Sequence, residues 1–471
     1  MQHKSEYIWA LIGRVVPLLI YLGTTMILAR FLTPDDFGMV GVLSIFLMVA
    51  QTLMDAGLGG SLIKEKEISN LDCSTIFVFN IVVSIILYVL IFIFAGTIEN
   101  YFSTPDLSII VRILCSVFIV NAFGLVPTSL LMRHLRFRII TIINISSVII
   151  AAIAAIVLAL SVRNVYALVT YQLVCAFITV TLSSVASKYK WSLKFSLASL
   201  RHLLPFGIFT TLSNVIDTVY ENLTTFFFGK YLNMQQAGFL SQAKRLEEVP
   251  TLSIVQTINS VAFPLLNQLR NDQMTFAKEC TETFKVVMLL ILPLLAVLAF
   301  FSEPIILLVL GYQWTSAAPY LTLLVLAAVF RIAETLNRTF IKSTTKVQEL
   351  FRYTLIKRVI GIAIILFSLY IEPSFMLYAY IISTFIGYIV NAILLSHISV
   401  ITFSTQSKLF ISTLLPSIAF YLTMIAVRLC FNSLVIEIFI GILLLLVYYF
   451  LVLRLYDINI ISFCLKFFNK N

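Results

Sequence analysis

Charged side chains inside long apolar runs are the residues of this sequence best suited to do chemistry. They include the arginines Arg14, Arg112 and Arg331. A charged side chain at the centre of a bilayer costs at least about 2.5–3.5 kcal/mol, so it usually faces a cavity or a partner. A guanidinium pairs with phosphate through two parallel hydrogen bonds. The three arginines are therefore candidates to hold an anionic head group in a cavity.

Each arginine also has a simpler explanation. Arg14 and Arg112 lie near the ends of their runs, where a long side chain can extend to the membrane interface. Arg331 lies deeper in its run, but Glu334 is one helical turn away and could neutralise it. Both explanations stay open for each arginine.

Two carboxylates, Asp217 and Glu221, lie four residues apart in another apolar run, on one face of a helix. Two such groups repel each other when both are ionised, which favours the binding of a proton or a sodium ion. The alternative is a fixed ion pair with a basic residue such as Arg14 or Arg331. We expect no metal site and no cofactor beyond this coupling ion, and whether it is H⁺ or Na⁺ stays open.

The remaining charges inside apolar runs predict less. A mixed block on one predicted helix favours local ion pairs among its own members, Lys244, Arg245, Glu247 and Glu248. Glu437 is isolated in its run and has no predicted role.

The elements that position these residues are membrane-spanning helices. The chain has 471 residues, of which 60% are hydrophobic and 11% charged, whereas a soluble domain carries about 25% charged residues. Because a spanning helix needs about 20 mostly apolar residues, the sequence predicts an all-α polytopic membrane protein with about fourteen spanning helices. The predicted runs are 8–29, 37–62, 75–96, 108–131, 138–160, 165–186, 203–228, 238–266, 284–301, 317–341, 354–371, 374–397, 408–428 and 433–454.

The distribution of basic residues predicts the orientation in the membrane. With a cytoplasmic N-terminus, 23 of the 32 Lys and Arg, Lys357 and Arg358 among them, fall in inner loops and tails, and four fall in outer loops. This bias follows the positive-inside rule and predicts that both termini are cytoplasmic. The net charge of +10 is explained by this topology, so we expect no nucleic-acid partner.

A short repeat indicates that the chain is built from two similar halves. ARFLTPDDFG at 29–38 matches GKYLNMQQAG at 229–238, and Thr24-Thr25 matches Thr224-Thr225 at the same offset of 200 residues. Many transporters consist of such repeats, which move against each other around a central site. The residues that mark the repeat and its flanks are candidate structural or gate positions, namely Arg30, Gly38, Asp55, Lys230 and Gly238.

The repeat also predicts the domain organisation. Six helices separate the two copies, so both copies cross the membrane in the same direction, and the pseudo-two-fold axis lies along the membrane normal. We predict an N-lobe at 1–187, a cytoplasmic connector at 188–202, a C-lobe at 203–400, and two accessory helices with a tail at 401–471. The outer loops around 97–107 and 302–316 are short, and the connector is the expected hinge.

Signatures of enzymes and metal sites are missing from the sequence. It has no HExxH, Walker loop, GxGxxG or serine elbow, and its four histidines lie far apart. Its six cysteines show no metal-like spacing and suit small apolar positions. The sequence therefore predicts that the chain is not an enzyme.

Six motifs carry a resemblance to a known family, and together they span most of both lobes. They are ARFLTPDDFG at 29–38, DAGL at 55–58, PTSLLMRHLRF at 127–137, GKYLNMQQAGFLSQAKRLEEVP at 229–250, VAFPLLNQL at 261–269 and PIILLVLGYQWTSAAP at 304–319. In these motifs the chain resembles bacterial polysaccharide exporters and lipid-linked oligosaccharide flippases of the multidrug/oligosaccharidyl-lipid/polysaccharide (MOP) superfamily. Fourteen helices are familiar in that superfamily, whose drug-exporting branch comprises the MATE transporters.

The resemblance implies a flippase of the bacterial inner membrane that works by alternating access. Its substrate would be an undecaprenyl-pyrophosphate-linked oligosaccharide repeat unit for O-antigen, capsule or exopolysaccharide, with the pyrophosphate held in a cationic cavity. The expected partners are this lipid-linked oligosaccharide and membrane lipids, and a polysaccharide polymerase and a chain-length regulator are partners to test. The protein is expected to be a monomer.

Two other functions stay open. A cation-coupled multidrug exporter of the same superfamily would have an aromatic and acidic cavity without an essential arginine. A membrane polysaccharide polymerase or ligase would need a catalytic outer loop, and the short outer loops argue against that function.

Overall fold

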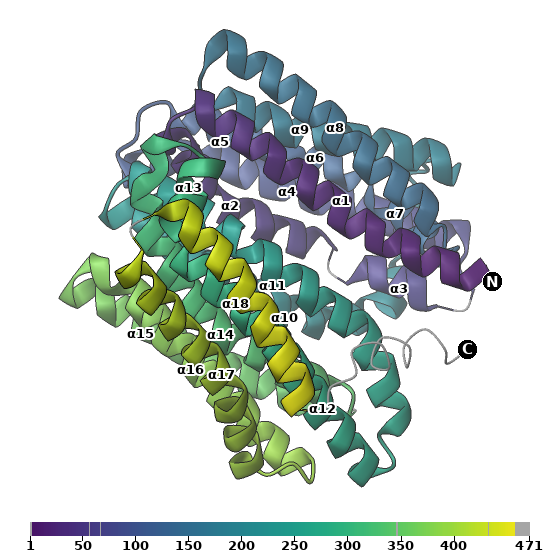
Figure 1. The fold of residues 1–471 in the computed structure, drawn as a ribbon. Coiled ribbons are helices and arrows are strands. Elements are labelled where there is room, and N and C mark those ends of the chain that lie inside the picture. The colour runs from purple at the N-terminus through teal and green to yellow at the C-terminus, as the bar shows by residue number, and fades with distance from the viewer. Residues whose placement is uncertain (1, 56, 66, 345–346, 432, 457–471) are drawn as a thin grey trace. The chain divides into compact units, whose positions relative to one another are not determined.

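The chain folds into helices, which the computed structural model describes over residues 2–55, 57–65, 67–344, 347–431 and 433–456 (Figure 1). Within these ranges there is no β-strand, which confirms the predicted all-α class. The helices divide into two compact units. Unit 1 comprises 1–242 together with 309–314, and unit 2 comprises 243–308 and 315–471.

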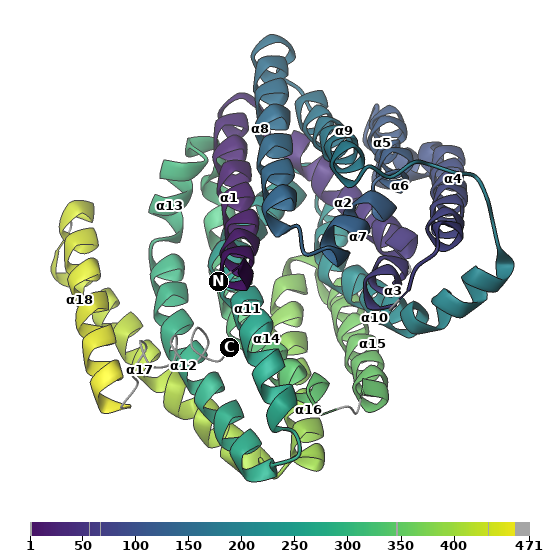
Figure 2. The same ribbon diagram turned by 90° about the vertical axis from the view of Figure 1, so that its right-hand side faces the viewer.

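Unit 1 holds the first ten helices and the start of the eleventh. They are α1 (Gln2–Phe31), α2 (Pro34–Asp55), α3 (Leu58–Lys64), α4 (Asn70–Phe102), α5 (Leu107–Cys115), α6 (Val117–Ala122), α7 (Leu125–Arg133), α8 (Phe137–Val162), α9 (Tyr166–Ser187), α10 (Leu197–Tyr231) and α11 (Met234–Leu269). Helix α8 packs between α1 and α9, and α2 packs against α10 (Figures 1 and 2).

Unit 2 holds the rest of α11 and the helices that follow it. They are α12 (Gln273–Phe300), α13 (Ser302–Val309), the 3-10 helix η1 (Tyr312–Ala317), α14 (Ala318–Lys342), α15 (Val347–Ile371), the 3-10 helix η2 (Pro373–Phe375), α16 (Met376–Ile398), α17 (Phe403–Cys430) and α18 (Leu434–Leu455). Helix α16 packs on both α14 and α15, and α17 lies between α12 and α18.

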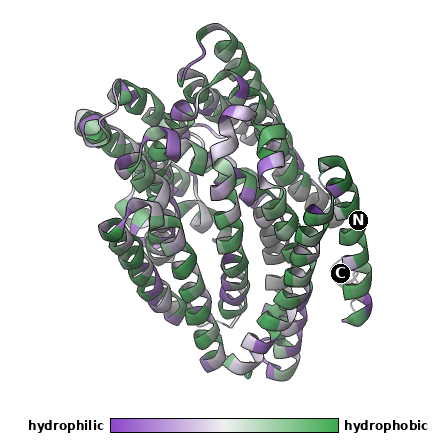
Figure 3. Ribbon diagram, turned by 60° about the vertical axis from the view of Figure 1, so that its left-hand side comes forward, coloured by the Kyte–Doolittle hydropathy of each residue, from purple (hydrophilic) through white to green (hydrophobic). Residues whose placement is uncertain are grey.

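Most of these helices are apolar along their length (Figure 3). Ten described stretches are long and apolar enough to cross a membrane, and α5–α6 with α7, a pair bent by 44°, make an eleventh if they are counted as one span. The three other predicted runs, 8–29, 203–228 and 238–266, form the long helices α1, α10 and α11. The polytopic class is therefore confirmed, and the number fourteen stays a prediction.

The repeat found in the sequence is also present in the local structure. Helix α1 ends at residue 31 and α2 begins at 34, and α10 ends at 231 and α11 begins at 234. Each second helix begins with the same kind of cap. The side-chain hydroxyl of Thr33 accepts a hydrogen bond from the backbone N–H of Asp36 at 3.4 Å, and the side chain of Asn233 accepts one from the backbone N–H of Gln236 at 2.8 Å.

The two copies meet at their matching glycines within unit 1. A Cβ atom built on Gly38 would overlap the carbonyl oxygen of Met234, and one built on Gly238 would overlap the carbonyl oxygen of Pro34. The two contacts are equivalent, because each glycine and each carbonyl group in one contact has its counterpart 200 residues away in the other. Glycine is required at both positions because the backbones of α2 and α11 touch there.

The structure changes two expectations about the connecting segments. The non-helical part of the predicted connector covers 188–196, because α10 already begins at Leu197. The hydroxyl of Ser74 on α4 donates to the carbonyl oxygens of Ser192 at 2.7 Å and Lys194 at 2.6 Å. The connector is therefore tied to unit 1.

The second expectation concerns the predicted outer loop at 302–316, which is mostly helical because it contains α13 and most of η1. The boundaries predicted for the lobes, the pseudo-two-fold axis and the cytoplasmic termini stay predictions.

Candidate functional site

The densest group of buried charges lies in unit 2, where α14 meets α11, α15 and α16. Arg331, Glu334 and Arg338 lie three to four residues apart on α14 and share one face of the helix. Their charged neighbours come from the other helices. The side chain of Arg331 forms an ion pair with Glu247 of α11, whose side chain is fully buried, while 21% of the Arg331 side chain stays exposed.

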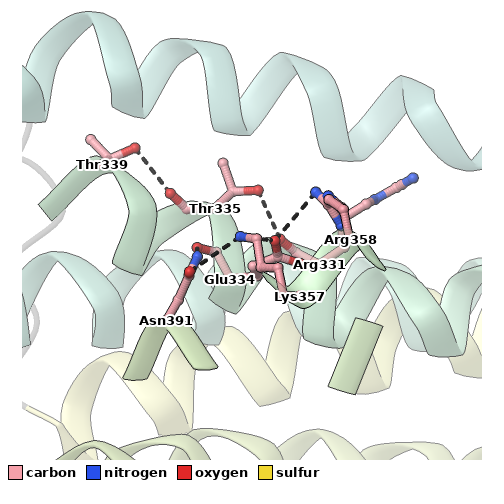
Figure 4. Close-up of polar contacts among 7 residues, drawn as sticks. All are labelled: Arg331, Glu334, Thr335, Thr339, Lys357, Arg358 and Asn391. Carbon is pink, nitrogen blue, oxygen red and sulfur yellow. Dashed lines mark hydrogen bonds and ion pairs between the residues drawn. The ribbon is translucent and has the colours of Figure 1, made fainter. Parts of the chain in front are cut away.

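Glu334 is the centre of a second network (Figure 4). Its Oε1 atom accepts a hydrogen bond from the Lys357 ammonium at 2.6 Å and lies 3.3 Å from the Arg358 guanidinium. The Lys357 ammonium also donates to Oδ1 of Asn391 on α16 at 3.1 Å. The Asn391 amide donates in turn to the backbone carbonyl of Glu334, at 3.1 Å. One carboxylate and one amide thus join three helices.

A glycine on α16 makes room for the Glu334 carboxylate. A Cβ atom built on Gly387 would lie 2.7 Å from Oε2 of Glu334, closer than van der Waals contact allows. A side chain at this position would displace either the Glu334 carboxylate or helix α16. The present place of this carboxylate therefore depends on Gly387.

These charges are largely removed from solvent. The side chains of Lys357, Glu334 and Arg358 are 1%, 4% and 8% exposed. Removing such ions from water costs several kcal/mol each, and only close pairing with good hydrogen bonds compensates for it. The arrangement can therefore fix the helices in one packing, and it keeps four cations, at Arg331, Arg338, Lys357 and Arg358, on neighbouring faces of two helices.

The hydroxyl groups of two threonines cover the polar side of α14. Thr335 donates to the carbonyl of Arg331 at 2.8 Å and Thr339 donates to the carbonyl of Thr335 at 3.0 Å (Figure 4). Each hydroxyl group thus donates to a backbone carbonyl of its own helix, four residues earlier in the chain. The polar stripe of α14 therefore continues past the ion pairs through these two uncharged residues.

The other predicted arginines lie elsewhere. Arg14 is on α1, and its side chain lies outside the described part of the structure. Arg112 is on α5 in unit 1, with its guanidinium 4.6 Å from the centre of the Phe92 ring, and its Nε atom has no hydrogen-bond partner. Arg112 and Arg331 thus belong to different units, and only Arg331 joins the charge network of unit 2.

The predicted carboxylate pair is divided between two environments. Asp217 on α10 is buried, at 8% exposure, and Glu221, one turn further along, is exposed. Two carboxylates that share a helix face in the sequence are therefore not equivalent in the structure.

The remaining predicted positions have structural contacts. Arg30 lies beside Gly311, and the Lys230 ammonium donates to the carbonyl oxygen of Tyr101. Asp55 ends α2 next to Gly59 of α3, where a Cβ atom built on the glycine would lie 2.8 Å from the aspartate Oδ1 atom. Arg30, Lys230 and Asp55, like Gly38 and Gly238, thus have roles in helix packing and in the turns between helices.

Two members of the network were not predicted from the sequence. Lys357 and Arg358 were counted as inner-loop residues, but both are buried on α15. The sequence did contain an indication of this, because both residues lie inside the apolar run 354–371. Two adjacent cations in such a run require a buried partner of opposite charge. The expectation of local pairs in the block 244–248 is wrong for Glu247, because this residue pairs with Arg331.

A further pair was unexpected. Glu437 on α18 lies 3.1 Å from the guanidinium of Arg428 on α17. The Arg428 guanidinium also lies 4.0 Å from the centre of the Phe300 ring on α12. The two accessory helices are therefore joined to each other and to α12.

Comparisons with known proteins extend this description. The profile of the family described as "Polysaccharide biosynthesis protein" matches residues 27–319. The lipopolysaccharide biosynthesis protein WzxC of Escherichia coli (strain K12) is 27% identical over 351 residues, which cover 74% of this chain and 71% of that protein. The succinoglycan biosynthesis transport protein ExoT of Rhizobium meliloti (strain 1021) is 24% identical over 319 residues, or 68% of this chain and 65% of that protein.

Among solved structures, the fold is similar to that of the lipid II flippase MurJ in an inward closed conformation. The TM-score is 0.75 at 16% identity, over 96% of this chain and 100% of that one. At this identity the likeness shows the fold alone. A transport protein among the sequence relatives confirms the prediction that this chain is not an enzyme.

Proposed function

This chain belongs to the polysaccharide biosynthesis protein family, and from that premise we propose that it is a flippase for lipid-linked oligosaccharides. The substrate is an undecaprenyl-pyrophosphate-linked repeat unit, which the protein moves across the bacterial inner membrane by alternating access. The product supplies a surface polysaccharide such as O-antigen, capsule or exopolysaccharide. The fold supports the proposal because it is similar to that of a flippase.

The observation that carries the proposal is the pairing of Arg331. Its guanidinium is held by Glu247, a carboxylate with no exposed side-chain surface, yet the arginine itself keeps 21% of its side chain exposed. A guanidinium has five N–H donors, so the bond to Glu247 leaves donors for another anion. Diphosphate oxygens are suitable acceptors because they take bidentate, charge-assisted hydrogen bonds.

The first experiment deletes the gene and analyses the lipid-linked oligosaccharides together with the surface polysaccharide. We expect undecaprenyl-linked repeat units to accumulate on the cytoplasmic side while the surface polymer is lost. Normal polymer together with increased sensitivity to cationic drugs would instead support the multidrug-exporter alternative. Normal polymer with no other change would refute the flippase proposal in that strain.

The second experiment restores the deleted gene with single variants. Arg331→Ala should abolish export at an unchanged protein level, and Arg331→Lys should restore export only in part, because lysine keeps the charge but loses the planar fork. Arg163→Ala is the matched control, since Arg163 is an exposed arginine at the end of α8. Normal export by Arg331→Ala would remove this residue from substrate binding.

Coupling to an ion gradient is proposed for Asp217. Asp217 is buried and Glu221 is exposed. Asp217→Asn is therefore the test variant, and Glu221→Gln is its control. We expect Asp217→Asn alone to remove the gradient dependence of transport in vesicles. Equal behaviour of the two variants would exclude Asp217 as the coupling group.

A further inference from the structure

A short segment closes over the end of α1 within unit 1. The amide of Gln313 donates hydrogen bonds to the carbonyl oxygens of Ala29 at 2.6 Å and Leu32 at 3.1 Å, and the indole N–H of Trp314 donates to Ala29 at 3.0 Å. The last carbonyl groups of a helix have no partner within the helix itself. Here they are satisfied by two side chains that lie more than 280 residues away in the sequence.

The indole of Trp314 is also the centre of an aromatic cluster. It is fully buried and makes edge-to-face contacts with Phe37 on α2 at 5.1 Å and Phe239 on α11 at 5.9 Å. Both phenylalanines are next to the glycines of the repeat. Phe37 directly precedes Gly38, and Phe239 directly follows Gly238. Trp314 therefore covers the point where the two repeats touch.

A turn before the tryptophan completes this contact. Gly311 has a φ of +106°, a conformation that favours glycine. A Cβ atom built on it would lie 3.3 Å from the Arg30 guanidinium. We call Gln313 and Trp314, together with the end of α1, the first clasp.

The second repeat carries a counterpart, formed by the end of α4 on the end of α10. The Lys230 ammonium, which matches Arg30 at the offset of 200 residues, donates to the carbonyl oxygen of Tyr101 and lies 4.5 Å from the centre of its ring. Phe102 packs edge-to-face on Phe226 at 5.1 Å, and a Cβ atom built on Gly229 would lie 3.6 Å from its ring. We call Tyr101 and Phe102, together with the end of α10, the second clasp.

The clasps are reciprocal. The end of the first-repeat helix α1 is bound by a segment that follows α13, and the end of the second-repeat helix α10 is bound by a segment that ends α4. Residues 309–314 belong to unit 1, although the chain on both sides of them belongs to unit 2. Side-chain hydrogen bonds and ring contacts hold this segment on the end of α1, and such contacts can be released when the flanks of the segment move.

We propose that the two clasps are releasable locks on the ends of α1 and α10, and that Gln313 and Trp314 leave the end of α1 during the transport cycle. The proposal rests on transport by alternating access. In the state described here the first clasp is engaged, because its hydrogen bonds are formed and its indole is buried. Weakening the clasp should therefore shift the protein toward a state in which the end of α1 is uncovered.

The test measures whether the end of α1 becomes accessible. Ala29 is fully buried beneath the clasp, so Ala29→Cys, in a variant without the native cysteines, is the reporter for a water-soluble maleimide. Ala151→Cys is the control reporter, because Ala151 on α8 is equally buried and takes no part in the clasp. The purified protein is labelled in lipid nanodiscs, where both sides of the membrane are accessible.

Trp314→Ala with Gln313→Ala should raise the labelling rate of Ala29→Cys about tenfold or more, since a buried indole and three hydrogen bonds are lost, and should leave Ala151→Cys unchanged. Gln313→Leu, which removes only the amide donors, should give a smaller increase with the same selectivity. Unchanged labelling of Ala29→Cys in both variants would overturn the proposal. An equal rise at both reporters in Gln313→Leu would also overturn it, because the segment would then be part of the fold and not a lock.

Labelling requires no substrate, so this result is independent of the flippase assignment. If the deletion strain keeps its surface polymer while the clasp variants expose Ala29→Cys selectively, the proposed function fails and the lock stands. If export depends on the gene but labelling never changes, the function stands and the lock fails.

Discussion

The ion pair between Lys357 and Glu334 gives the sharpest prediction about stability. Replacing Lys357 with methionine keeps most of the side-chain volume and removes the charge. The variant loses the hydrogen bond to Glu334 at 2.6 Å and the one to Asn391 at 3.1 Å. It also leaves the Glu334 carboxylate, only 4% exposed, without its nearest cation.

Breaking a buried pair by removing one partner costs about 3–5 kcal/mol. The Arg358 guanidinium remains 3.3 Å from the same carboxylate oxygen and keeps part of the attraction. We therefore expect Lys357→Met to lower the free energy of unfolding by about 3 kcal/mol, the lower end of this range. Combining Lys357→Met with Glu334→Gln should cost less than the sum of the two single variants, because the two charges that pair with each other are removed together, although Arg358 then loses its carboxylate partner.

The assay is unfolding of the purified protein by SDS titration in mixed micelles, supported by the melting temperature. Lys278→Met is the matched control, since Lys278 is an exposed lysine on α12 and should change stability by less than about 0.5 kcal/mol. The reasoning is refuted if Lys357→Met behaves like this control. It is also refuted if the double variant loses as much stability as the sum of the two single variants.

Three other substitutions test close packing and capping. Gly38→Ala should destabilise the protein by about 1–3 kcal/mol because the new methyl group overlaps backbone, whereas Gly96→Ala, which has nothing within 4 Å, should not lower the melting temperature. Gly387→Ala should also destabilise the protein, because its methyl group meets the Glu334 carboxylate. An unchanged melting temperature would contradict the close approach of α16 to α14. Ser69→Ala should cost about 1 kcal/mol in the same assay, since Ser69 forms the capping box of α4, and a neutral result would show that packing alone sets the start of this helix.

Hydropathy was enough to predict most of the fold, because long apolar runs in a bilayer have few alternatives to helices. The repeat was predicted from one short match, and the structure confirms it at the helix ends near 31 and 231 and at the caps Thr33 and Asn233. The prediction was weaker for short elements. Helix α13 and the 3-10 helix η1 were read as a loop, since eight or fewer residues contain too few turns to show a helical period.

The candidate site was predicted only in part, because the partner of a buried charge is set by tertiary packing. Arg331 was recognised from its depth in an apolar run, but its partner is Glu247 on a distant helix and not Glu334, one turn away. Lys357 was missed because its position at the start of a run looks like the end of a loop. Sequence spacing identifies neighbours along one helix, whereas these pairs join different helices.

The contact between Gly38 and Gly238 has a consequence for the history of the chain. Each glycine lies on the backbone at the start of the other helix, so the contact is self-complementary, as are the contacts of a dimer with two-fold symmetry. A chain of half this length could have paired with a second copy of itself through a single glycine-marked surface. Fusion of the two copies would have kept that pairing, and a larger residue at either glycine would require a matching adjustment in the other half.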